Sequence, residues 1–284
     1  MEKPLAWITG AGGLIGSELT RIAAAQMPGW DILPLTRAEL DITDPIAVRR
    51  LFTERPPSLI LHGAGIAKTP VCQNDPALAH RVNVQATARL AELAADIPFF
   101  FFSTDLAFDG QKGNYTETDA VSPLTVYAQT KVEAERIVLQ NPRHTVVRFA
   151  LNAGRSPTGD RAFNENMRRT WQEGKVTKLF VDEFRTPIPV AFTARAVWEL
   201  AKQQATGLFH VAGSERLSYF EAGSLLARRW PELKPQIEPT SIKDFKGTPR
   251  APDTSLDNSK LQRLLSFTLP NFSEWARTAA PEEF

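Results

Sequence analysis

The chain has 284 residues, with 33 Lys and Arg against 32 Asp and Glu, so its formal net charge is +1. This balance excludes a general electrostatic attraction to nucleic acid or to an anionic membrane. Hydrophobic residues make up 43% of the chain and charged residues 23%, which excludes a disordered protein. No apolar run reaches about 18 residues, and the N-terminal apolar stretch has no cleavage site, so we expect a cytoplasmic protein.

Cysteine and histidine give no indication of a metal site. Cys72 is the single cysteine, and we expect it to be a small buried side chain. The four histidines show no metal-binding spacing, so we expect no bound metal.

Apolar runs alternate with helical patterns over the first 150 residues. The predicted strands cover 5–9, 32–36, 58–64, 97–104 and 145–149. A first helix is predicted from Ser17, a second after Asp44 as N-cap with Pro45 at the first helical position, and a long third one over 77–96.

Strands with continuous apolar runs are buried on both faces, as in parallel sheets. The sequence therefore predicts an α/β fold with a Rossmann-type, doubly wound parallel sheet. An α+β fold would need hairpin signals, and none precedes residue 150. We expect residues 1–150 to form one domain around this sheet. Residues 151–284, with helices near 163–173 and 218–230, should form a smaller domain, with some segments returning to the sheet.

A glycine-rich turn connects the first strand to the first helix. Gly10, Gly13 and Gly16, with Leu14 and Ile15 between the last two, form G-x-x-G-x-x-G. Such glycines let backbone N–H groups approach a pyrophosphate at the positive end of a helix. An ordinary loop is the alternative, but the strand–turn–helix context favours a dinucleotide site.

Arg37 follows the second strand, where NAD-selective folds usually have an acid, and the first carboxylate after it is Glu39. An arginine there suits a 2′-phosphate, so NADP(H) is favoured. Because a surface arginine after a strand is common, NAD(H) stays open.

Tyr127 and Lys131 are four residues apart on a predicted helix and share one face. A Lys ammonium near the phenol should lower the tyrosine pKa and suit it to acid–base work. The alternative is that Lys131 merely pairs with Glu135. Thr104 lies at the end of the apolar 97–104 strand, where a hydroxyl can bind a substrate oxygen or simply cap a turn.

These motifs resemble the extended short-chain dehydrogenase/reductases, and within them the dTDP-4-dehydrorhamnose reductase (sugar-nucleotide reductase) family. The resemblance rests on the glycine turn, STDLAFDG, the Tyr–Lys pair, and the stretches LDITDP, VNVQAT, VDEFRTPI and RAPDTSLDNSKLQ. It implies a catalytic triad of Thr104, Tyr127 and Lys131. It further implies cofactor contacts from Asp41, Ile42, Ala64, Tyr127 and Lys131, and a substrate contact from Asp105.

Arg185 lies in VDEFRTPI, and its guanidinium suits a substrate phosphate or sugar. An ion pair with Asp182 or Glu183 that only shapes the loop is the alternative. The resemblance implies reduction of a keto group on a nucleotide-linked sugar. We expect residues 1–150 to form the NAD(P)-binding domain and residues 151–284 to form mainly the substrate-binding domain, and the chain is compatible with a homodimer.

Two other functions stay open. Dehydratases of this superfamily usually have Glu where this chain has Leu106, which disfavours dehydration or epimerisation. A non-catalytic NADP-binding subunit, like the β subunit of methionine adenosyltransferase, also resembles this branch. Residues 62–75, 148–154 and 182–187 depart from the reductase pattern, so the substrate need not be dTDP-4-dehydrorhamnose.

Overall fold

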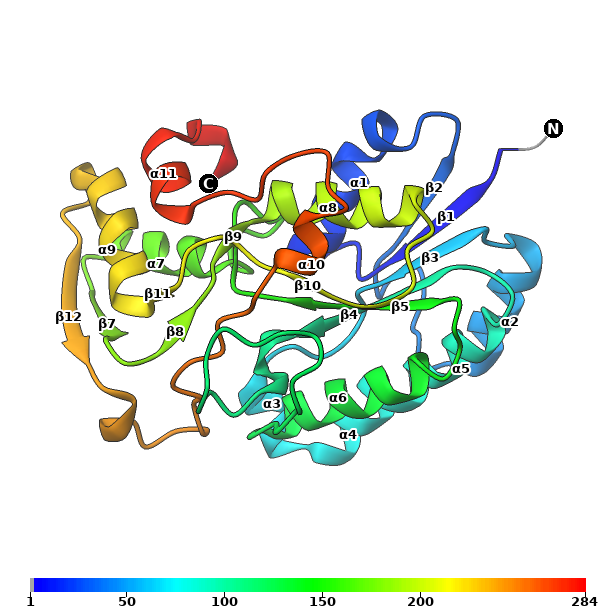
Figure 1. The fold of residues 1–284 in the computed structure, drawn as a ribbon, viewed down its shortest axis with the longest axis horizontal. Helices are drawn as coiled ribbons and strands as arrows, with labels where there is room; N and C mark the ends of the chain where they lie inside the picture. Colours follow the sequence, from blue (N-terminus) through cyan, green and yellow to red (C-terminus); the bar gives the residue numbers. More distant parts are fainter. Residues whose placement is uncertain (1–2) are drawn as a thin grey trace.

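The computed structural model describes residues 3–284 and is built around one parallel six-stranded sheet (Figure 1). The strand order is β10-β5-β4-β3-β1-β2. The strands are β1 (Leu5–Thr9), β2 (Asp31–Leu35), β3 (Leu59–His62), β4 (Phe99–Thr104), β5 (His144–Phe149) and β10 (Gly207–Val211). Every neighbouring pair is parallel, so the predicted Rossmann-type α/β fold is confirmed.

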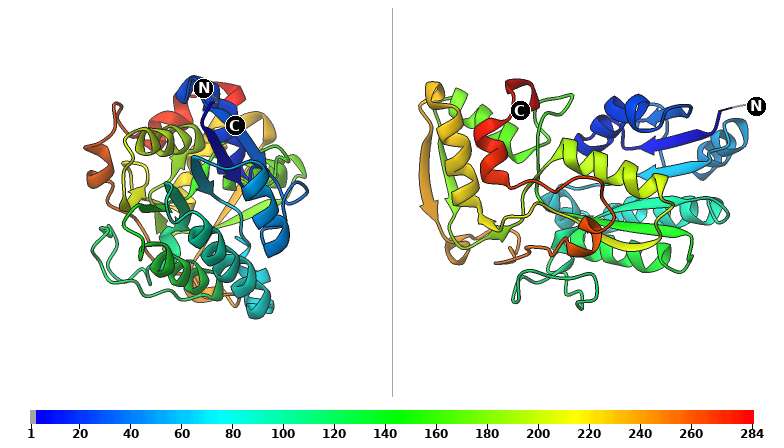
Figure 2. Two further views of the ribbon diagram at one scale, coloured as in Figure 1. Left: turned by 90° about the vertical axis from the view of Figure 1, so that its right-hand side faces the viewer. Right: turned by 45° about the horizontal axis from the view of Figure 1, so that its top comes forward.

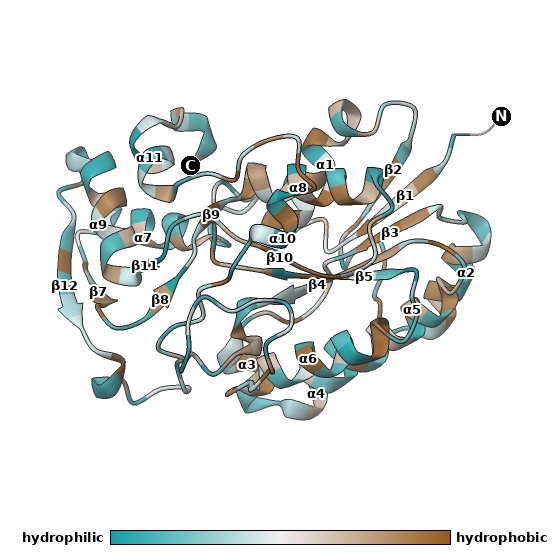
Figure 3. Ribbon diagram, viewed as in Figure 1, coloured by the Kyte–Doolittle hydropathy of each residue, from teal (hydrophilic) through white to brown (hydrophobic). Residues whose placement is uncertain are grey.

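Helices cover both faces of this sheet. One face carries α1 (Leu14–Gln26) and α8 (Val190–Lys202), and the other carries α2 (Pro45–Glu54), α5 (Ala86–Leu93) and α6 (Val126–Val138). The alternating side chains of each strand enter one core or the other: Ile8 and Phe100 face α1 and α8, whereas Trp7 and Phe99 face α2 and α5. Figure 3 shows the hydrophobic colouring of β1 and β3 and the hydrophilic residues on the outer side of α6.

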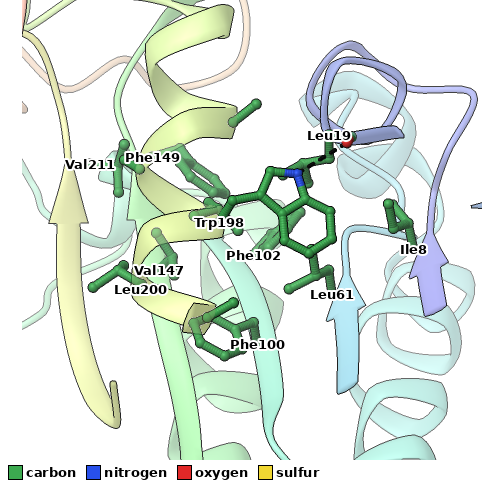
Figure 4. Packing of buried hydrophobic residues seen from close by; sticks show 14 of the residues in the cluster. Ile8, Leu19, Leu61, Phe100, Phe102, Val147, Phe149, Trp198, Leu200 and Val211 are labelled. Atoms are coloured by element: carbon green, nitrogen blue, oxygen red, sulfur yellow. Dashed lines mark hydrogen bonds between the residues drawn. The ribbon is translucent and has the colours of Figure 1, made fainter. Parts of the chain in front are cut away.

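Trp198 of α8 fills the centre of one core. Its side chain is fully buried, and its indole N–H donates to the Leu19 carbonyl of α1 at 3.1 Å (Figure 4). Phe102, Leu61 and Val147 from three strands surround it. Helix α8, from the second half of the chain, therefore completes the core of the sheet that the first half forms.

The remaining elements gather beyond the carboxyl ends of the strands (Figure 2). They comprise α7 (Phe163–Gln172), β7 (Val176–Phe180), β8 (Phe184–Arg185), β11 (Leu217–Ser218), α9 (Tyr219–Arg229), β12 (Gln236–Thr240) and α11 (Phe272–Thr278). Strands β7 and β12 pair in parallel, β8 and β11 antiparallel. This group has an aromatic core of its own that includes Trp171, Trp230, Trp275 and Phe284. Shorter elements complete the chain: α3 (Thr69–Asn74), α4 (Pro76–His80), β6 (Asn152–Ala153), β9 (Ile188–Pro189) and α10 (Ser259–Gln262).

Two predicted helices need correction, and one helix was missed. The long helix over 77–96 is interrupted, because Arg81–Gln85 forms a π-helical turn between α4 and α5. The first helix starts at Leu14 rather than Ser17, because the Ser17 N–H already bonds to the Gly13 carbonyl at 3.0 Å. Helix α8 was not predicted: most of its 13 residues are buried, so no polar face reveals its period.

Within residues 3–284, no helix combines the length and the apolar character that crossing a membrane requires.

Candidate active site

The glycine turn brings α1 directly against the end of β1. Gly10 has φ +73°, and a Cβ there would lie 2.6 Å from the Gly63 carbonyl carbon. A Cβ on Gly16 would overlap the Gly10 carbonyl oxygen. These two positions therefore require glycine, and the close approach leaves the N-terminus of α1 at Leu14 and Ile15 beside the strand end.

The end of β2 adjoins this turn, because the Ala11 N–H donates to the Leu35 carbonyl at 3.2 Å. Arg37 follows with its side chain 91% exposed, and its Nη2 is 3.7 Å from Asp41 Oδ2. The Glu39 carboxylate accepts from the Thr36 N–H and hydroxyl, and these hydrogen bonds lower the pKa of Glu39. Arg37 is thus an exposed cation at this edge, while the carboxylate of Glu39 is already engaged.

The other expected cofactor residues have local partners. The Asp41 carboxylate accepts from the Thr43 N–H at 2.9 Å, and Ile42 is packed into the core under α2. At the end of β3, the Ala64 N–H donates to the Thr9 hydroxyl at 3.2 Å. These residues line the same sheet edge as the glycine turn.

The structure brings Thr104, Tyr127 and Lys131 together. Thr104 ends β4, and Tyr127 lies in the first turn of α6, whose N-cap Thr125 accepts from the Ala128 N–H at 3.3 Å. The Thr104 hydroxyl lies close enough to the Tyr127 phenol to lower its pKa. Lys131 lies one turn further along α6, with Nζ 3.8 Å from the centroid of the Phe101 ring.

Burial controls the protonation of the pair. It raises the pKa of Tyr127 to about 12, although the neighbouring Thr104 hydroxyl opposes this rise. Burial also lowers the pKa of Lys131 to about 7. The lowered tyrosine pKa expected from the Tyr–Lys spacing is therefore wrong, because burial acts most strongly on the phenol and raises its pKa. The phenol stays protonated at neutral pH.

Lys131 does not form the simple ion pair with Glu135 that the sequence left open. The Glu135 carboxylate instead binds the guanidinium of Arg148, with Nη2 to Oε2 at 2.6 Å.

Arg185 joins the second half of the chain to the end of β4. Its Nη1 is 2.5 Å from Asp105 Oδ2, and its Nη2 is 3.3 Å from Glu183 Oε1. Glu183 is also held by Arg250, with Nη2 to Oε1 at 2.9 Å. Asp182 is not a partner, since its carboxylate accepts from the Ile242 N–H at 2.8 Å. Arg185 is 7% exposed, and its Nε has no hydrogen-bond acceptor among the described residues.

The chain is similar to known proteins over nearly its whole length. The RmlD substrate binding domain family matches residues 6–282. The chain belongs to this family. The family that the sequence motifs resembled is thereby confirmed.

Three similar proteins, two known by sequence and one by crystal structure, share most of their length with this chain. A dTDP-4-dehydrorhamnose reductase from Aggregatibacter actinomycetemcomitans is 26% identical over 286 residues, covering 95% of each chain. The methionine adenosyltransferase 2 subunit beta of Xenopus laevis is 28% identical over 275 residues, covering 91% of this chain and 82% of that protein. The crystal structure of a dTDP-4-dehydrorhamnose reductase from Clostridium acetobutylicum aligns with a TM-score of 0.86 at 26% identity, covering 95% of this chain and 96% of the other.

One residue of this RmlD-family site was missed from the sequence. Asn83, on the π-helical turn, accepts from the Ile66 N–H at 2.8 Å and donates to the Ile66 carbonyl at 3.1 Å. It also donates to the Thr130 hydroxyl at 3.1 Å, and Thr130 donates to the Tyr127 carbonyl at 2.7 Å. Asn83 therefore ties the loop after β3 to the helix that carries Tyr127. The only sequence signal was the VNVQAT stretch, which by itself assigned no role to the asparagine.

Proposed function

We propose that this protein is an NADP(H)-dependent reductase of a keto group on a nucleotide-linked sugar. The observation that carries the proposal is the juxtaposition of Thr104, at the end of β4, with Tyr127 of α6 at the carboxyl edge of the sheet that also holds the glycine turn. A proton donor next to a dinucleotide site is what carbonyl reduction requires. Membership of the RmlD family and the reductases among the relatives support it.

The cofactor would supply the hydride when bound. Tyr127 would donate its phenolic proton to the oxygen that becomes the product alcohol, while the Thr104 hydroxyl orients that oxygen. Lys131, as an ammonium, would bind a ribose hydroxyl and favour the phenolate left after proton transfer. The high pKa of Tyr127 keeps the proton in place until the carbonyl accepts electrons.

The cofactor choice follows from the end of β2. The exposed Arg37 guanidinium is available for a 2′-phosphate, and Glu39 is already bound to Thr36. NADP(H) is therefore the proposed cofactor, with NAD(H) the weaker alternative.

We assign cofactor binding mainly to residues 1–150 and substrate binding mainly to residues 151–284. Asp105 and Arg185 meet where these parts join, beside Tyr127. The unpartnered Nε of the buried Arg185 is a donor suited to a phosphate or sugar oxygen. Leu106 supplies no acid, which favours reduction over elimination.

A second function is favoured by one observation. The relative named methionine adenosyltransferase 2 subunit beta is as similar to this chain as the reductase is. A binding subunit would need the glycine turn but would have no use for Tyr127 as a proton donor.

Turnover separates the two functions. NADPH oxidation would be followed with a panel of dTDP- and UDP-linked 4-keto sugars, for the wild type, Tyr127→Phe and the control Gln129→Ala on the exposed side of α6. We expect Tyr127→Phe to bind NADPH normally and to lose about 10²–10⁴-fold in kcat. No turnover of any keto sugar by the wild type would favour the binding subunit, whereas equal turnover by the wild type and Tyr127→Phe would mean that Tyr127 is not the proton donor.

A further inference from the structure

A buried carboxylate lies directly behind the catalytic residues. Glu135 is 2% exposed. Its Oε1 accepts from Arg148 Nε at 3.0 Å and from the Ser103 hydroxyl, and its Oε2 accepts from Arg148 Nη2 at 2.6 Å. Both carboxylate oxygens are thus engaged, which is the arrangement that makes a buried charge tolerable.

The partners of Glu135 come from the elements that carry the triad. Ser103 immediately precedes Thr104 on β4, and Arg148 on β5 is the register partner of Ser103. Glu135 lies one helical turn beyond Lys131 on α6. The carboxylate therefore links the strand end that carries Thr104 to the helix that carries Lys131.

The protonation of Lys131 depends on the charged groups around it, because Lys131 has no carboxylate partner within hydrogen-bond distance among the described residues. Its Nζ lies over the Phe101 ring, and burial opposes its charge. Glu135 acts against burial, and a Cys72 thiolate would act in the same direction, although burial raises the pKa of this thiol. His62 of β3 is fully buried, with a pKa lowered to about 3 chiefly by burial, so its ring adds no positive charge. Beyond Arg148, the His210 ring nitrogen is 3.5 Å from Nη1, and burial lowers its pKa to about 3 as well.

We propose that Glu135 is a positioning residue for the Thr104–Tyr127–Lys131 site: held by Arg148 and Ser103, its carboxylate fixes the end of β4 against α6 and keeps the Lys131 ammonium protonated. The catalytic meaning of this role rests on the proposed function, because only a reductase needs a charged Lys131 beside the cofactor. The effect on the ionisation of Lys131 does not, and it can be measured in the ligand-free protein.

The first experiment titrates the Lys131 Nζ signal by NMR in protein labelled with 15N-lysine, assigned by its loss in Lys131→Met. We expect Glu135→Gln to move the titration midpoint of Lys131 down by about one pH unit, which is a tenfold loss of protonation. The matched control is Glu133→Gln on the same helix, where the carboxylate is half exposed and pairs with His80. The control should titrate like the wild type. An unchanged midpoint in Glu135→Gln would overturn the proposal.

Two further variants guard against misfolding, because Glu135→Gln leaves Arg148 buried and unpaired. Glu135→Gln combined with Arg148→Met removes both charges and should fold, yet it should still show the lowered midpoint. Glu135→Asp keeps the charge and should restore most of the wild-type midpoint. A wild-type midpoint in the double variant would refute the role of Glu135.

The second experiment is kinetic. In Glu135→Gln, the fall of kcat at high pH should begin at a lower pH, with KM for the sugar substrate unchanged. A merely structural residue would lower activity without moving the pH profile. If no variant shows turnover but the Lys131 midpoint still shifts, the proposed function fails while the role of Glu135 in the ionisation of Lys131 stands.

Discussion

Asp105 and Arg185 are 80 positions apart in the sequence, yet Asp105 Oδ2 and Arg185 Nη1 are 2.5 Å apart in the structure. Both side chains are less than 10% exposed. They act in opposite directions on Tyr127, since Asp105 raises its pKa and Arg185 lowers it, although burial is the larger cause. The ion pair therefore joins the two halves of the chain at the point where the proton donor lies.

Replacing Arg185 should destabilise the protein as well as weaken substrate binding. Arg185→Met leaves the Asp105 carboxylate buried without its cation, which typically costs about 3–5 kcal/mol. The melting temperature should fall by about 2–4 °C for each kcal/mol. The control Arg216→Met breaks a half-exposed pair with Asp253 and should cost about 0–1 kcal/mol.

A second variant distinguishes the structural role of Arg185 from its role in binding. Arg185→Met with Asp105→Asn removes both charges and should recover much of the lost stability. If KM returns to the wild-type value together with stability, Arg185 does not bind the substrate.

The buried Lys131 should make stability depend on pH in a defined direction. Its pKa is about 7 in the folded chain and about 10.5 in the unfolded chain, so between these values the unfolded state holds a proton that the folded state has released. The free energy of unfolding of the wild type should therefore rise with pH relative to Lys131→Met, by at most about 1.4 kcal/mol per pH unit. Urea denaturation of both proteins at intervals of roughly one unit above pH 6 measures this difference. A difference that stays constant between pH 7 and 9 would contradict the lowered pKa of Lys131 in the folded chain.

Arg37 should select the cofactor without supporting the fold. Arg37→Ala removes a 91% exposed side chain, so the melting temperature should not change. A lost hydrogen bond to a charged phosphate is worth about 1.5–3 kcal/mol, so NADPH affinity should fall about 10- to 100-fold while NADH affinity holds. Fluorescence titration with both cofactors tests this, with Arg50→Ala on the exposed side of α2 as the control. Equal affinity of the wild type for NADPH and NADH would count against Arg37 as the selector.

Two glycines of the same turn should respond differently to alanine. A Cβ on Gly16 would overlap the backbone of Gly10, so Gly16→Ala should melt several degrees lower and lose cofactor binding. A Cβ on Gly12 would lie 3.6 Å from Thr36 Cγ2, an ordinary contact, so Gly12→Ala should keep the wild-type melting temperature. Similar melting temperatures for the two variants would mean that the turn can relax around Gly16.

The sheet could be predicted from the sequence because its strands are continuous apolar runs. The apolar run ending in Ser103 and Thr104 has no alternation, and Asp44 with Pro45 marks a helix start that the structure confirms: the Asp44 side chain accepts from the N–H groups of Ile46 and Ala47. The site residues at strand ends followed from the same logic, since parallel strands share one carboxyl edge.

Other features depend on contacts between distant segments, which no local pattern contains. The partner of Arg185 is Asp105 as well as the nearby Glu183, and only the folded chain shows it. The pKa of Tyr127 is set by the loss of water around it, whereas the sequence showed only its spacing from Lys131. Asn83 on the π-helical turn accepts a hydrogen bond from the Ile66 N–H, in a loop 17 residues earlier in the chain.

The pairing of β10 with β5 also limits how this chain can be divided. A fragment ending near residue 150 would expose the whole edge of His144–Phe149, which β10 covers along five register pairs. It would also lack Trp198, leaving Leu19, Leu61 and Phe102 facing water. Exposed strand edges and apolar faces of this kind promote aggregation. Such a fragment should be insoluble, so a shortened chain meant to bind the cofactor alone would have to keep residues 190–211.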